Sequence, residues 1–325
     1  MSKRKALILG IAGQDGSYLA EHLLQIGYEV EGVLRRNSTP EHQESRIHHL
    51  EGKIKTYYGD VTDIQSISQI LSKSSPDVIY NLAAQSHVRI SFDIPEYTAE
   101  TNGMSVLKLL ELIRQHDPTI KYYQASSSEM FGSTVDSDGF QRETTSMTPV
   151  SPYGCSKLFA YSAVRNYRNA YGLFATNGIL FNHESPRRAS NFVTTKVVKT
   201  AIAIKLGVES QLVLGNLDSS RDWGHSRDYV RAMQLMMDLP APGDYVVATG
   251  ITHSVRELCQ VVFSKLGMEY QKYVIQDPRF MRPEELPYLR GDASLFRDTV
   301  DWKPEVTFEQ MLDEMIEIWL TRLNK

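Results

Sequence analysis

The first half of the chain alternates short apolar runs with segments whose apolar residues recur at helical spacing. The strand-like segments predict strands over residues 6–9, 30–34, 55–58, 78–82 and 121–125, of which 6–9 and 78–82 should be buried. The amphipathic segments predict helices over residues 18–26, 64–71 and 105–114. Because strands that alternate with helices form parallel sheets covered on both faces, we expect an α/β fold with a doubly wound, Rossmann-type parallel sheet.

The pattern changes after about residue 180. Residues 182–195 are polar, and residues 281–291 contain two prolines and several charges. Near the end, Thr307 and Gln310 have the spacing of a helix capping box, and apolar residues then line one helix face. We therefore expect residues 1–180 to form the nucleotide-binding domain, with residues 220–250 packing back onto it. Residues 181–325 should mainly form a smaller, C-terminal substrate-binding lobe.

The charge and cysteine content argue against several classes of protein. The 35 Lys and Arg residues against 39 Asp and Glu give a formal net charge of −4, which disfavours electrostatic binding of nucleic acid. No window approaches the roughly 18 consecutive apolar residues of a membrane-spanning helix. Cys155 and Cys259 have neither a disulfide framework nor a metal-type spacing, which favours reduced thiols in a cytoplasmic protein. We interpret the apolar stretch that ends at Gly10 as a strand and not a targeting signal.

Three glycines stand between the first predicted strand and the first predicted helix. Gly10, Gly13 and Gly16 have the spacing G-x-x-G-x-x-G, with Gln14 and Asp15 before the last of them. Such a turn lets the backbone approach a pyrophosphate, and the first helical turn offers N–H groups and a positive dipole end. The sequence predicts a dinucleotide-binding turn, although a glycine-rich turn without a ligand would have the same pattern.

Two arginines at the end of the second predicted strand indicate which dinucleotide is bound. In this fold the second strand ends beside the adenosine ribose, where an acidic residue suits NAD and an arginine accommodates the 2'-phosphate of NADP. Arg35 and Arg36, which precede Asn37 and Ser38, therefore predict NADP as the cofactor. The alternative is a solvated basic pair.

Tyr153 and Lys157 form a Tyr-x-x-x-Lys pattern that predicts acid–base chemistry. On a helix, residues four apart share a face, so the ammonium would lie near the phenol and favour its ionised form. The tyrosine, whose ordinary pKa is about 10, would then accept protons near neutral pH. The pattern is common by chance, but it gains weight after a glycine-rich turn and a serine-rich strand end.

That serine-rich strand end carries Ser126, Ser127 and Ser128, followed by Glu129. It lies where parallel sheets of this class bind ligands. A serine hydroxyl can donate to a substrate oxygen, and a carboxylate could remove a carbon-bound proton that an adjacent carbonyl had acidified. We expect Ser126 to hold the cofactor or the fold. The alternative for the others is helix capping, with Ser127 or Ser128 as N-cap and Glu129 in the first turn.

Several longer motifs point to a family. They are residues 10–18 (GIAGQDGSY), 58–63 (YGDVTD), 81–88 (NLAAQSHV), 151–157 (SPYGCSK), 178–188 (GILFNHESPRR) and 214–229 (LGNLDSSRDWGHSRDY). With them the chain resembles the extended short-chain dehydrogenase/reductases over nearly its whole length. Among these it is similar to the nucleotide-sugar dehydratases of the GDP-mannose 4,6-dehydratase family, and the last two motifs are the most diagnostic.

The resemblance implies a hydro-lyase that converts GDP-α-D-mannose to GDP-4-dehydro-6-deoxy-α-D-mannose and water, toward deoxysugars of the GDP-fucose or GDP-rhamnose type. Tyr153, assisted by Lys157, would deprotonate the C4 hydroxyl while NADP takes the C4 hydride. The 4-keto group acidifies H5, and Glu129 would remove H5 and help water leave from C6 before the hydride returns to C6. Ser127 occupies the position of the family's catalytic hydroxyl.

The histidines lack a metal-like spacing with carboxylates, so no metal is expected. The resemblance also implies ligand contacts, residue by residue. Those for NADP are Gly10, Gly13, Gln14, Asp15, Gly16, Arg35, Arg36, Asn37, Ser38, Asp60, Val61, Leu82, Ala83, Ala84, Gln85, Ser86, Tyr97, Lys157, His183 and Arg188. Those for GDP-mannose are Ser86, Ser127, Glu129, Tyr153, Asn182, Val193, Lys196, Asn216, Arg221, Arg282 and Glu285. A homodimer or homotetramer is expected.

Two positions depart from the family's pattern. Ser127 replaces the usual catalytic threonine, so the hydroxyl is kept but the methyl that restrains its rotamer is lost. Thr195 replaces a usual arginine, which puts one charged contact to a ligand or a subunit in doubt. We interpret the histidines, His87 and His225 among them, as supporting or surface residues and not as bases.

Two other functions stay open from the sequence. The first is a nucleotide-sugar epimerase or reductase on the same scaffold. Glu129 beside Ser127 argues against it, because epimerisation at C4 needs no base for the C5 proton. The second is a non-catalytic NADP-binding protein, which would not need Tyr153, Lys157 and Glu129 together.

Overall fold

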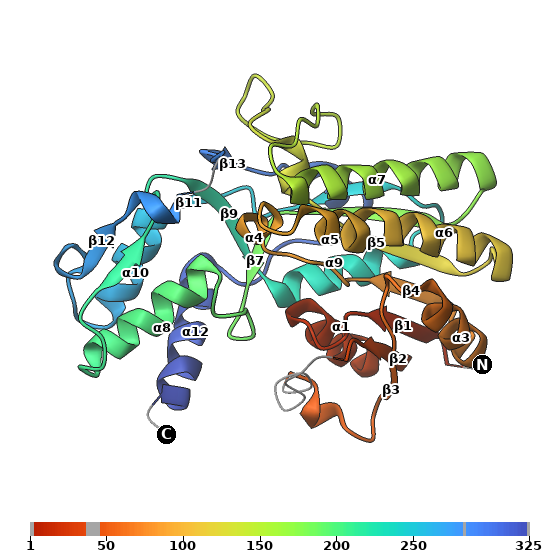
Figure 1. The fold of residues 1–325 in the computed structure, drawn as a ribbon, viewed down its shortest axis with the longest axis horizontal. Coiled ribbons are helices and arrows are strands. Elements are labelled where there is room, and N and C mark those ends of the chain that lie inside the picture. Colours follow the sequence, from red (N-terminus) through yellow and green to blue (C-terminus); the bar gives the residue numbers. More distant parts are fainter. Residues whose placement is uncertain (1–2, 37–45, 282–283, 324–325) are drawn as a thin grey trace.

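The structure, a computed structural model, describes residues 3–36, 46–281 and 284–323. Figure 1 shows a layered α/β part and, beside it, a smaller lobe that carries the C terminus. Among the described residues no helix is long and apolar enough to cross a membrane.

The layered part is built on seven parallel strands in the order β10-β6-β5-β4-β1-β2-β3. They are β1 (Lys5–Leu9), β2 (Glu29–Leu34), β3 (Lys55–Tyr58), β4 (Val78–Asn81), β5 (Lys121–Ser127), β6 (Ala175–Leu180) and β10 (Asp244–Val247). The order reverses between β1 and β4, and ligands of doubly wound folds bind in the crevice at such a switch point. The predicted fold class is confirmed.

Helices cover both faces of this sheet because its strands are apolar on both sides. Ala6 and Ile8 of β1 pack in one core, and Leu7 and Leu9 pack in the other. The first core includes side chains of α1 (Gln14–Gln25) and α9 (Ser226–Asp238). The second core includes α3 (Ile64–Ser74), α6 (Ser105–His116) and α7 (Pro152–Tyr171).

Shorter helical pieces connect these elements. They are η1 (His48–Leu50), α4 (Val88–Ser91), α5 (Pro95–Ala99), the π-helical turn η2 (Glu100–Met104) and the 3-10 helix η3 (Ser128–Phe131). The first helix begins at Gln14, earlier than the apolar pattern predicted, because the glycine-rich turn leads directly into it. The helix predicted from residue 105 continues without a break from η2, so its beginning was not visible as an apolar boundary.

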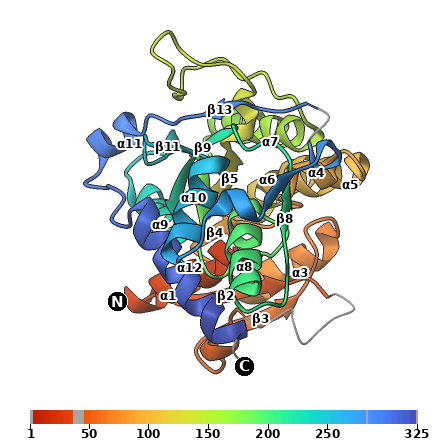
Figure 2. The same ribbon diagram turned by 90° about the vertical axis from the view of Figure 1, so that its left-hand side faces the viewer.

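The lobe has its own hydrophobic core between α8 (Val193–Lys205), α10 (Val255–Lys265) and α12 (Phe308–Leu323). Figure 2 shows these helices from the outer side of the lobe. The predicted capping box is confirmed, since Gln310 N donates to Thr307 Oγ1 at 3.2 Å and Thr307 N donates to Gln310 Oε1 at 2.9 Å. The remaining elements are β7 (Asn182–Glu184), β8 (Leu212–Leu214), β9 (Ser220–His225), β11 (Thr252–Ser254), η4 (Tyr270–Lys272), β12 (Val274–Gln276), η5 (Pro278–Phe280), β13 (Tyr288–Leu289) and α11 (Ser294–Thr299).

The chain passes between the two parts more than once. After β6 it forms β7 and α8, and β9 then pairs with β7, β11 and β13. From β9 it returns to the layered part, where α9 contacts α1 and β10 pairs with β6. Strand β9 therefore lies at the junction, beside the carboxyl ends of the central strands.

Candidate active site

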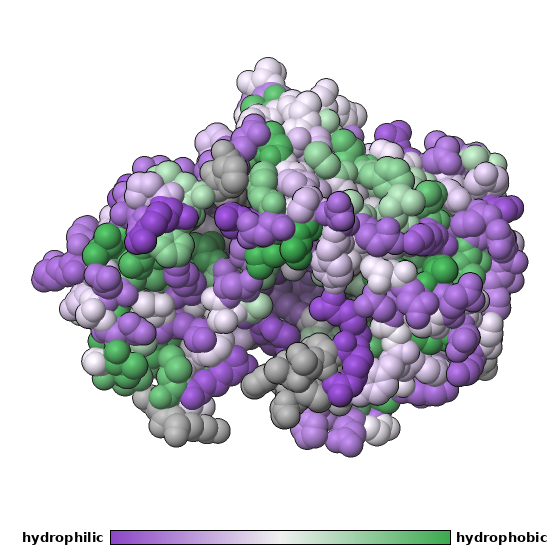
Figure 3. All heavy atoms as spheres, in the orientation of Figure 1, coloured by the Kyte–Doolittle hydropathy of each residue, from purple (hydrophilic) through white to green (hydrophobic). Residues whose placement is uncertain are grey.

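A cavity of about 720 Å³ lies at this junction, and Figure 3 shows the molecule hollowed between its two parts. Its lining comes from the segments after β4, β5 and β6 and from β9, α8 and η5 of the lobe. The predicted residues that line it are Asp15, Leu82, Ala84, Ser86, Ser127, Glu129, Tyr153, Lys157, Asn182, His183, Arg188, Val193, Lys196, Asn216, Arg221 and Glu285. The structure thus brings together residues as far apart in the sequence as Asp15 and Glu285.

The glycine-rich turn has the geometry that close backbone approach requires. Gly10 has a φ of +84°, which disfavours a side chain, and a Cβ on Gly16 would lie 2.3 Å from the carbonyl oxygen of Gly10. Gly13 caps α1 without any side-chain hydrogen bond to the first helical turn. An uncapped helix N terminus over a tight glycine turn fits a phosphate group.

Asp15 and His183 connect this turn to β7. His183 Nε2 lies 2.8 Å from Asp15 Oδ2, and His183 Nδ1 lies 2.7 Å from the carbonyl oxygen of Phe181. Both ring nitrogens face acceptors, which favours the imidazolium. Burial alone would lower the pKa of His183, but the Asp15 carboxylate outweighs it and the pKa is raised. Burial likewise opposes the charged form of Asp15, yet His183 and Arg188 hold its pKa below the ordinary value.

Tyr153 and Lys157 occupy the first turns of α7, which begins after the N-cap Ser151. Lys157 Nζ donates to the carbonyl oxygen of Ala125 at 2.8 Å and lies 5.8 Å from the centroid of the Tyr153 ring. Burial raises the pKa of Tyr153 to about 12, although a hydrogen bond to Ser127 opposes this, and burial lowers the pKa of Lys157 to about 8. The structure does not show the predicted lowering of the tyrosine pKa by the lysine, because burial raises that pKa and the ammonium donates to a backbone carbonyl instead.

Ser127 and Glu129 lie at the carboxyl end of β5, where η3 begins. Ser127 Oγ accepts from Glu129 N at 3.2 Å, so Ser127 is the N-cap of η3 and Glu129 lies in its first turn. The capping alternative thus describes the backbone, while both side chains also line the cavity. Ser126 Oγ donates to Asn177 Oδ1 at 3.0 Å, which ties β5 to β6. Ser126 therefore serves the fold.

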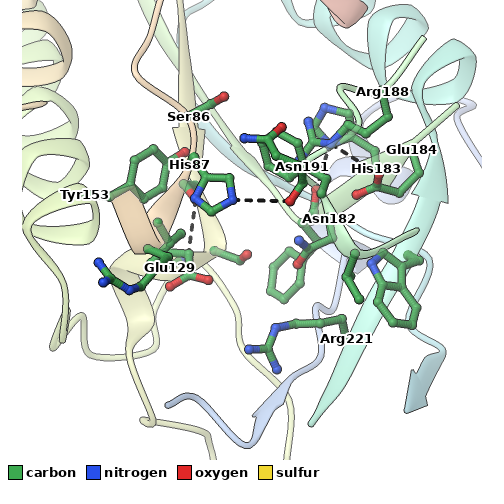
Figure 4. A pocket seen from close by; sticks show the side chains of 18 of the residues that line it. Ser86, His87, Glu129, Tyr153, Asn182, His183, Glu184, Arg188, Asn191 and Arg221 are labelled. Carbon is green, nitrogen blue, oxygen red and sulfur yellow. Dashed lines mark hydrogen bonds and ion pairs between the residues drawn. The ribbon is translucent and has the colours of Figure 1, made fainter. Parts of the chain in front are cut away.

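The proposed nucleotide-sugar contacts gather on the lobe side. Arg221 of β9 is buried and forms an ion pair with Glu285 at 3.6 Å. Lys196 of α8 donates to the carbonyl oxygen of Val213 at 2.7 Å, and its ammonium lies 4.7 Å from the centroid of the Phe280 ring. Asn216 donates to Ser219 Oγ at 2.9 Å. Figure 4 shows Arg221 across the cavity from Tyr153.

Other predicted residues do not line this cavity, namely Gly10, Gly13, Gln14, Gly16, Arg35, Arg36, Asp60, Val61, Ala83, Gln85 and Tyr97. Several of them still lie near one another. Arg35, after β2, donates to the hydroxyl of Tyr97 in α5, and a Cβ on Gly10 would lie 3.0 Å from the amide nitrogen of Ala83. Asn37, Ser38 and Arg282 lie outside the described residues.

Sequence reasoning did not assign several residues of the cavity wall to a ligand, among them His87, Glu184 and Phe192. His87 and Glu184 stand inside the motifs that identified the family, so their position was a usable signal. Phe192 gave none, because a lone phenylalanine before a helix is ordinarily core. Thr195 is fully buried and donates to the carbonyl oxygen of Arg188 at 3.4 Å, so this position does not line the cavity.

No metal site accompanies the cavity, since no group of three or more His, Cys, Asp or Glu side chains within residues 3–36, 46–281 and 284–323 could hold an ion. Trp223 lines the cavity and also stacks on Phe308, with ring centroids 5.8 Å apart.

Comparison with known proteins decides the family. The family model described as GDP-mannose 4,6 dehydratase matches residues 7–315. The chain belongs to the GDP-mannose 4,6-dehydratase family. GDP-mannose 4,6 dehydratase 2 of Arabidopsis thaliana is 49% identical over 97% of this chain and 86% of its own length. GDP-mannose 4,6 dehydratase of Homo sapiens is 45% identical over 98% of this chain and 92% of its own length.

Solved structures agree with the fold of this dehydratase family member. UDP-glucose 4-epimerase of Thermotoga maritima, with UDP-glucose, has a TM-score of 0.86 at 24% identity, covering 98% of this chain and 99% of its own. dTDP-glucose 4,6-dehydratase of Bacillus anthracis, in complex with NAD, has a TM-score of 0.84 at 23% identity, covering 98% and 97%. RMD of Pseudomonas aeruginosa, with NADPH, has a TM-score of 0.81 at 22% identity, covering 98% and 98%. The predicted resemblance is confirmed, and a nicotinamide cofactor fits the fold.

Proposed function

We propose that the chain carries out the reaction of its family, the conversion of GDP-mannose to GDP-4-dehydro-6-deoxymannose and water, with NADP as cofactor. The observation that carries this proposal is the shared cavity wall of Ser127, Glu129, Tyr153 and Lys157 opposite the arginine-bearing lobe. An epimerase does not need this carboxylate, and a binding protein needs none of these groups. Residues 1–180, with 220–250, would hold the cofactor, and residues 181–325 would mainly hold the nucleotide sugar.

The residues of the glycine-rich turn fit a dinucleotide. The uncapped N terminus of α1 and the steric limits at Gly10 and Gly16 suit a pyrophosphate. Arg35 and Arg36 follow β2, where the 2'-phosphate that distinguishes NADP from NAD would lie. When bound, the nicotinamide would supply the internal redox chemistry, because it can accept a hydride from C4 of the sugar and return that hydride to C6.

Three side chains would move protons. Tyr153 takes the proton of the C4 hydroxyl, and Ser127 donates to the C4 oxygen as it becomes a carbonyl. Glu129 then removes the proton from C5 and protonates the departing C6 hydroxyl, so that the elements of water leave and the carboxylate is restored. When the hydride is returned to C6, C5 takes up a proton, which balances the one that Tyr153 removed from the C4 hydroxyl. Because burial raises the pKa of Tyr153, positive charge beside the phenol, such as a bound oxidised nicotinamide would supply, would favour this proton transfer.

A homo-oligomer in the cytoplasm completes the proposal. Large apolar side chains are exposed on the neighbouring elements α5, η2 and α7, including Ile94, Tyr97, Met104 and Phe159. Figure 3 shows hydrophobic side chains over α7. Exposed apolar patches of this kind favour association with a second copy. Phe159→Glu should lower the molar mass measured by light scattering, whereas Val208→Glu, at a more exposed apolar site of the lobe, should not.

The activity is tested with GDP-mannose and NADP. Mass analysis of the sugar nucleotide should show loss of one water without net accumulation of NADPH. Glu129→Gln should abolish this loss while leaving the affinity for NADPH unchanged. Unchanged GDP-mannose, together with turnover of another nucleotide sugar, would contradict the substrate. Unaltered water loss in the variant would contradict the role of Glu129.

The cofactor is tested by its 2'-phosphate. Arg35→Ala and Arg36→Ala should each raise the Kd for NADPH by roughly tenfold, since a charged hydrogen bond contributes about 1.5–3 kcal/mol, with little effect on the Kd for NADH. Arg297→Ala on α11 is the matched control at another exposed arginine. Equal losses for both dinucleotides would contradict NADP specificity.

A further inference from the structure

The guanidinium of Arg188 is held on one face by an aromatic ring. Its Cζ lies 3.6 Å from the centroid of the Phe192 ring, and its Nε lies 3.2 Å from Glu184 Oε2. Glu184 is itself fixed, because it accepts from Thr194 Oγ1 at 2.6 Å. The main chain of Arg188 is tied to the same segment by its N–H, which donates to the carbonyl oxygen of Ser185 at 3.0 Å. Phe192 and Glu184 therefore both contact the guanidinium from the segment that surrounds Arg188.

The ring of Phe192 is contacted in turn by His87 from the loop after β4. The two ring centroids are 5.2 Å apart with an interplanar angle of 54°. His87 Nε2 lies 3.4 Å from the carbonyl oxygen of Asn191, and His87 Nδ1 accepts from Ile90 N at 3.3 Å. Since Nδ1 accepts, the hydrogen of the neutral ring belongs on Nε2, facing Asn191. Phe192 therefore lies between His87 of the layered part and Arg188 of the segment before α8 (Figure 4 shows His87 directed toward Asn191).

Arg188 lies on the cofactor side of the cavity. Burial opposes the charged form of Asp15 on the glycine-rich turn, but the charge of His183 and then that of Arg188 lower the pKa of this carboxyl. Figure 4 shows Arg188 beside His183 and Glu184, away from Glu129 and Tyr153. A guanidinium in this place can reach a phosphate bound at the turn only if its terminal amino groups point there.

We propose that Phe192 is a positioning residue that sets the plane of the Arg188 guanidinium for the diphosphate of the dinucleotide, and that His87 holds the ring in place. The proposal rests on the proposed function, which assigns Arg188 to the cofactor. A long flexible side chain binds an anion more tightly when its plane is fixed beforehand, because less rotational freedom is lost on binding. The contact between His87 and Phe192 also joins the two parts of the molecule across the cavity.

The test is a double-mutant cycle read as the Kd for NADPH by fluorescence, on the full chain freed of bound dinucleotide. Phe192→Leu should raise this Kd by roughly fivefold, within the range of cation–π contributions, and Phe192→Tyr should leave it within about twofold. In the Arg188→Gln background, Phe192→Leu should add nothing further. Phe280→Leu is the matched control, since that ring lies near Lys196 on the lobe side. It should change the affinity for GDP and not for NADPH.

Different results would contradict the assignment of Arg188 to the cofactor and the positioning role of Phe192. If Arg188→Gln leaves the Kd for NADPH unchanged, the assignment of Arg188 to the cofactor is wrong. If Arg188→Gln weakens binding but Phe192→Leu adds its full effect in that background, the positioning role is wrong. Should Phe192→Leu fail to fold, His87→Asn provides a second route, because it releases the ring without altering the start of α8. It should raise the Kd in the same direction, and an unchanged value would overturn the proposal.

Discussion

His183 Nε2 lies 2.8 Å from Asp15 Oδ2, which joins the strand after β6 to the turn between β1 and α1. The ring also stacks on Tyr229, with centroids 4.4 Å apart. A carboxylate at a phosphate-binding turn would repel a phosphate, and the facing imidazolium offsets that repulsion. The pair therefore serves both the fold and the electrostatics of the turn.

Replacing His183 should destabilise the protein in a pH-dependent way. The raised pKa of His183 means that its contribution is complete below the ordinary value of about 6.5 and is lost as the pH rises through the raised value. The lowered pKa of Asp15 means that its contribution is present above about 3.8 and is lost as the pH falls through the lowered value. In urea unfolding, His183→Gln should lose about 3 kcal/mol near pH 5.5 and less at pH 9. A loss that does not vary with pH would contradict this linkage.

Removing the buried charge of Lys157 should stabilise the protein while abolishing catalysis. Burial lowers the pKa of Lys157 to about 8, so below pH 8 the charged form opposes folding, and this effect fades as the pH rises toward about 10.5. Lys157→Met should therefore raise the free energy of unfolding in urea at pH 7. The net gain should be about 2 kcal/mol, because the hydrogen bond to Ala125 is lost at the same time. The gain should shrink by pH 10. Lys303→Met, at an exposed lysine, is the control and should change little.

The hydroxyl at position 127 should matter more than its methyl. Ser127→Thr keeps the acceptor for Glu129 N and restrains the rotamer, so turnover should be equal or higher. Ser127→Ala removes both the cap of η3 and the donor to the substrate, and kcat should fall by roughly 100-fold. Steady-state kinetics on both variants decide the matter. A large loss in the threonine variant would remove Ser127 from the catalytic group.

The buried carboxylate of Asp222 should fix the substrate side of the cavity. It accepts from Thr249 N, Thr249 Oγ1 and Gly250 N at 2.9, 2.6 and 2.8 Å, directly behind Arg221 on β9. The amide of an asparagine would place its NH2 group against at least one of these N–H or O–H donors. Asp222→Asn should therefore lower the free energy of unfolding by about 3 kcal/mol. Because β9 carries Arg221, KM for GDP-mannose should rise more than kcat falls. A change in kcat alone would argue for a different role.

Local patterns predicted the framework well. The strands at 30–34, 55–58 and 78–82 agree with β2, β3 and β4 to within one residue at each end. The buried strands β2 and β4 are apolar runs, whereas β3 is an edge strand that is mostly exposed. The capping box before α12 was visible because its two residues stand three apart in the sequence. The grouping of Glu129 with Tyr153 also followed, since the helix that comes after β5 begins at the same edge of the sheet where β5 ends.

The fold class, the glycine-rich turn, the family and part of the cavity wall could be predicted from the sequence. Packing decided which further residues, such as His87 and Phe192, line the cavity and where its charged groups point. Lys157 shares a helix face with Tyr153, but its ammonium binds a carbonyl of β5 that helical spacing does not reveal. His87, Phe192 and Arg188 meet only because β4 and α8 approach the same cavity. Spacing encodes contacts within an element, whereas contacts between elements depend on packing over distances in sequence that no local pattern records.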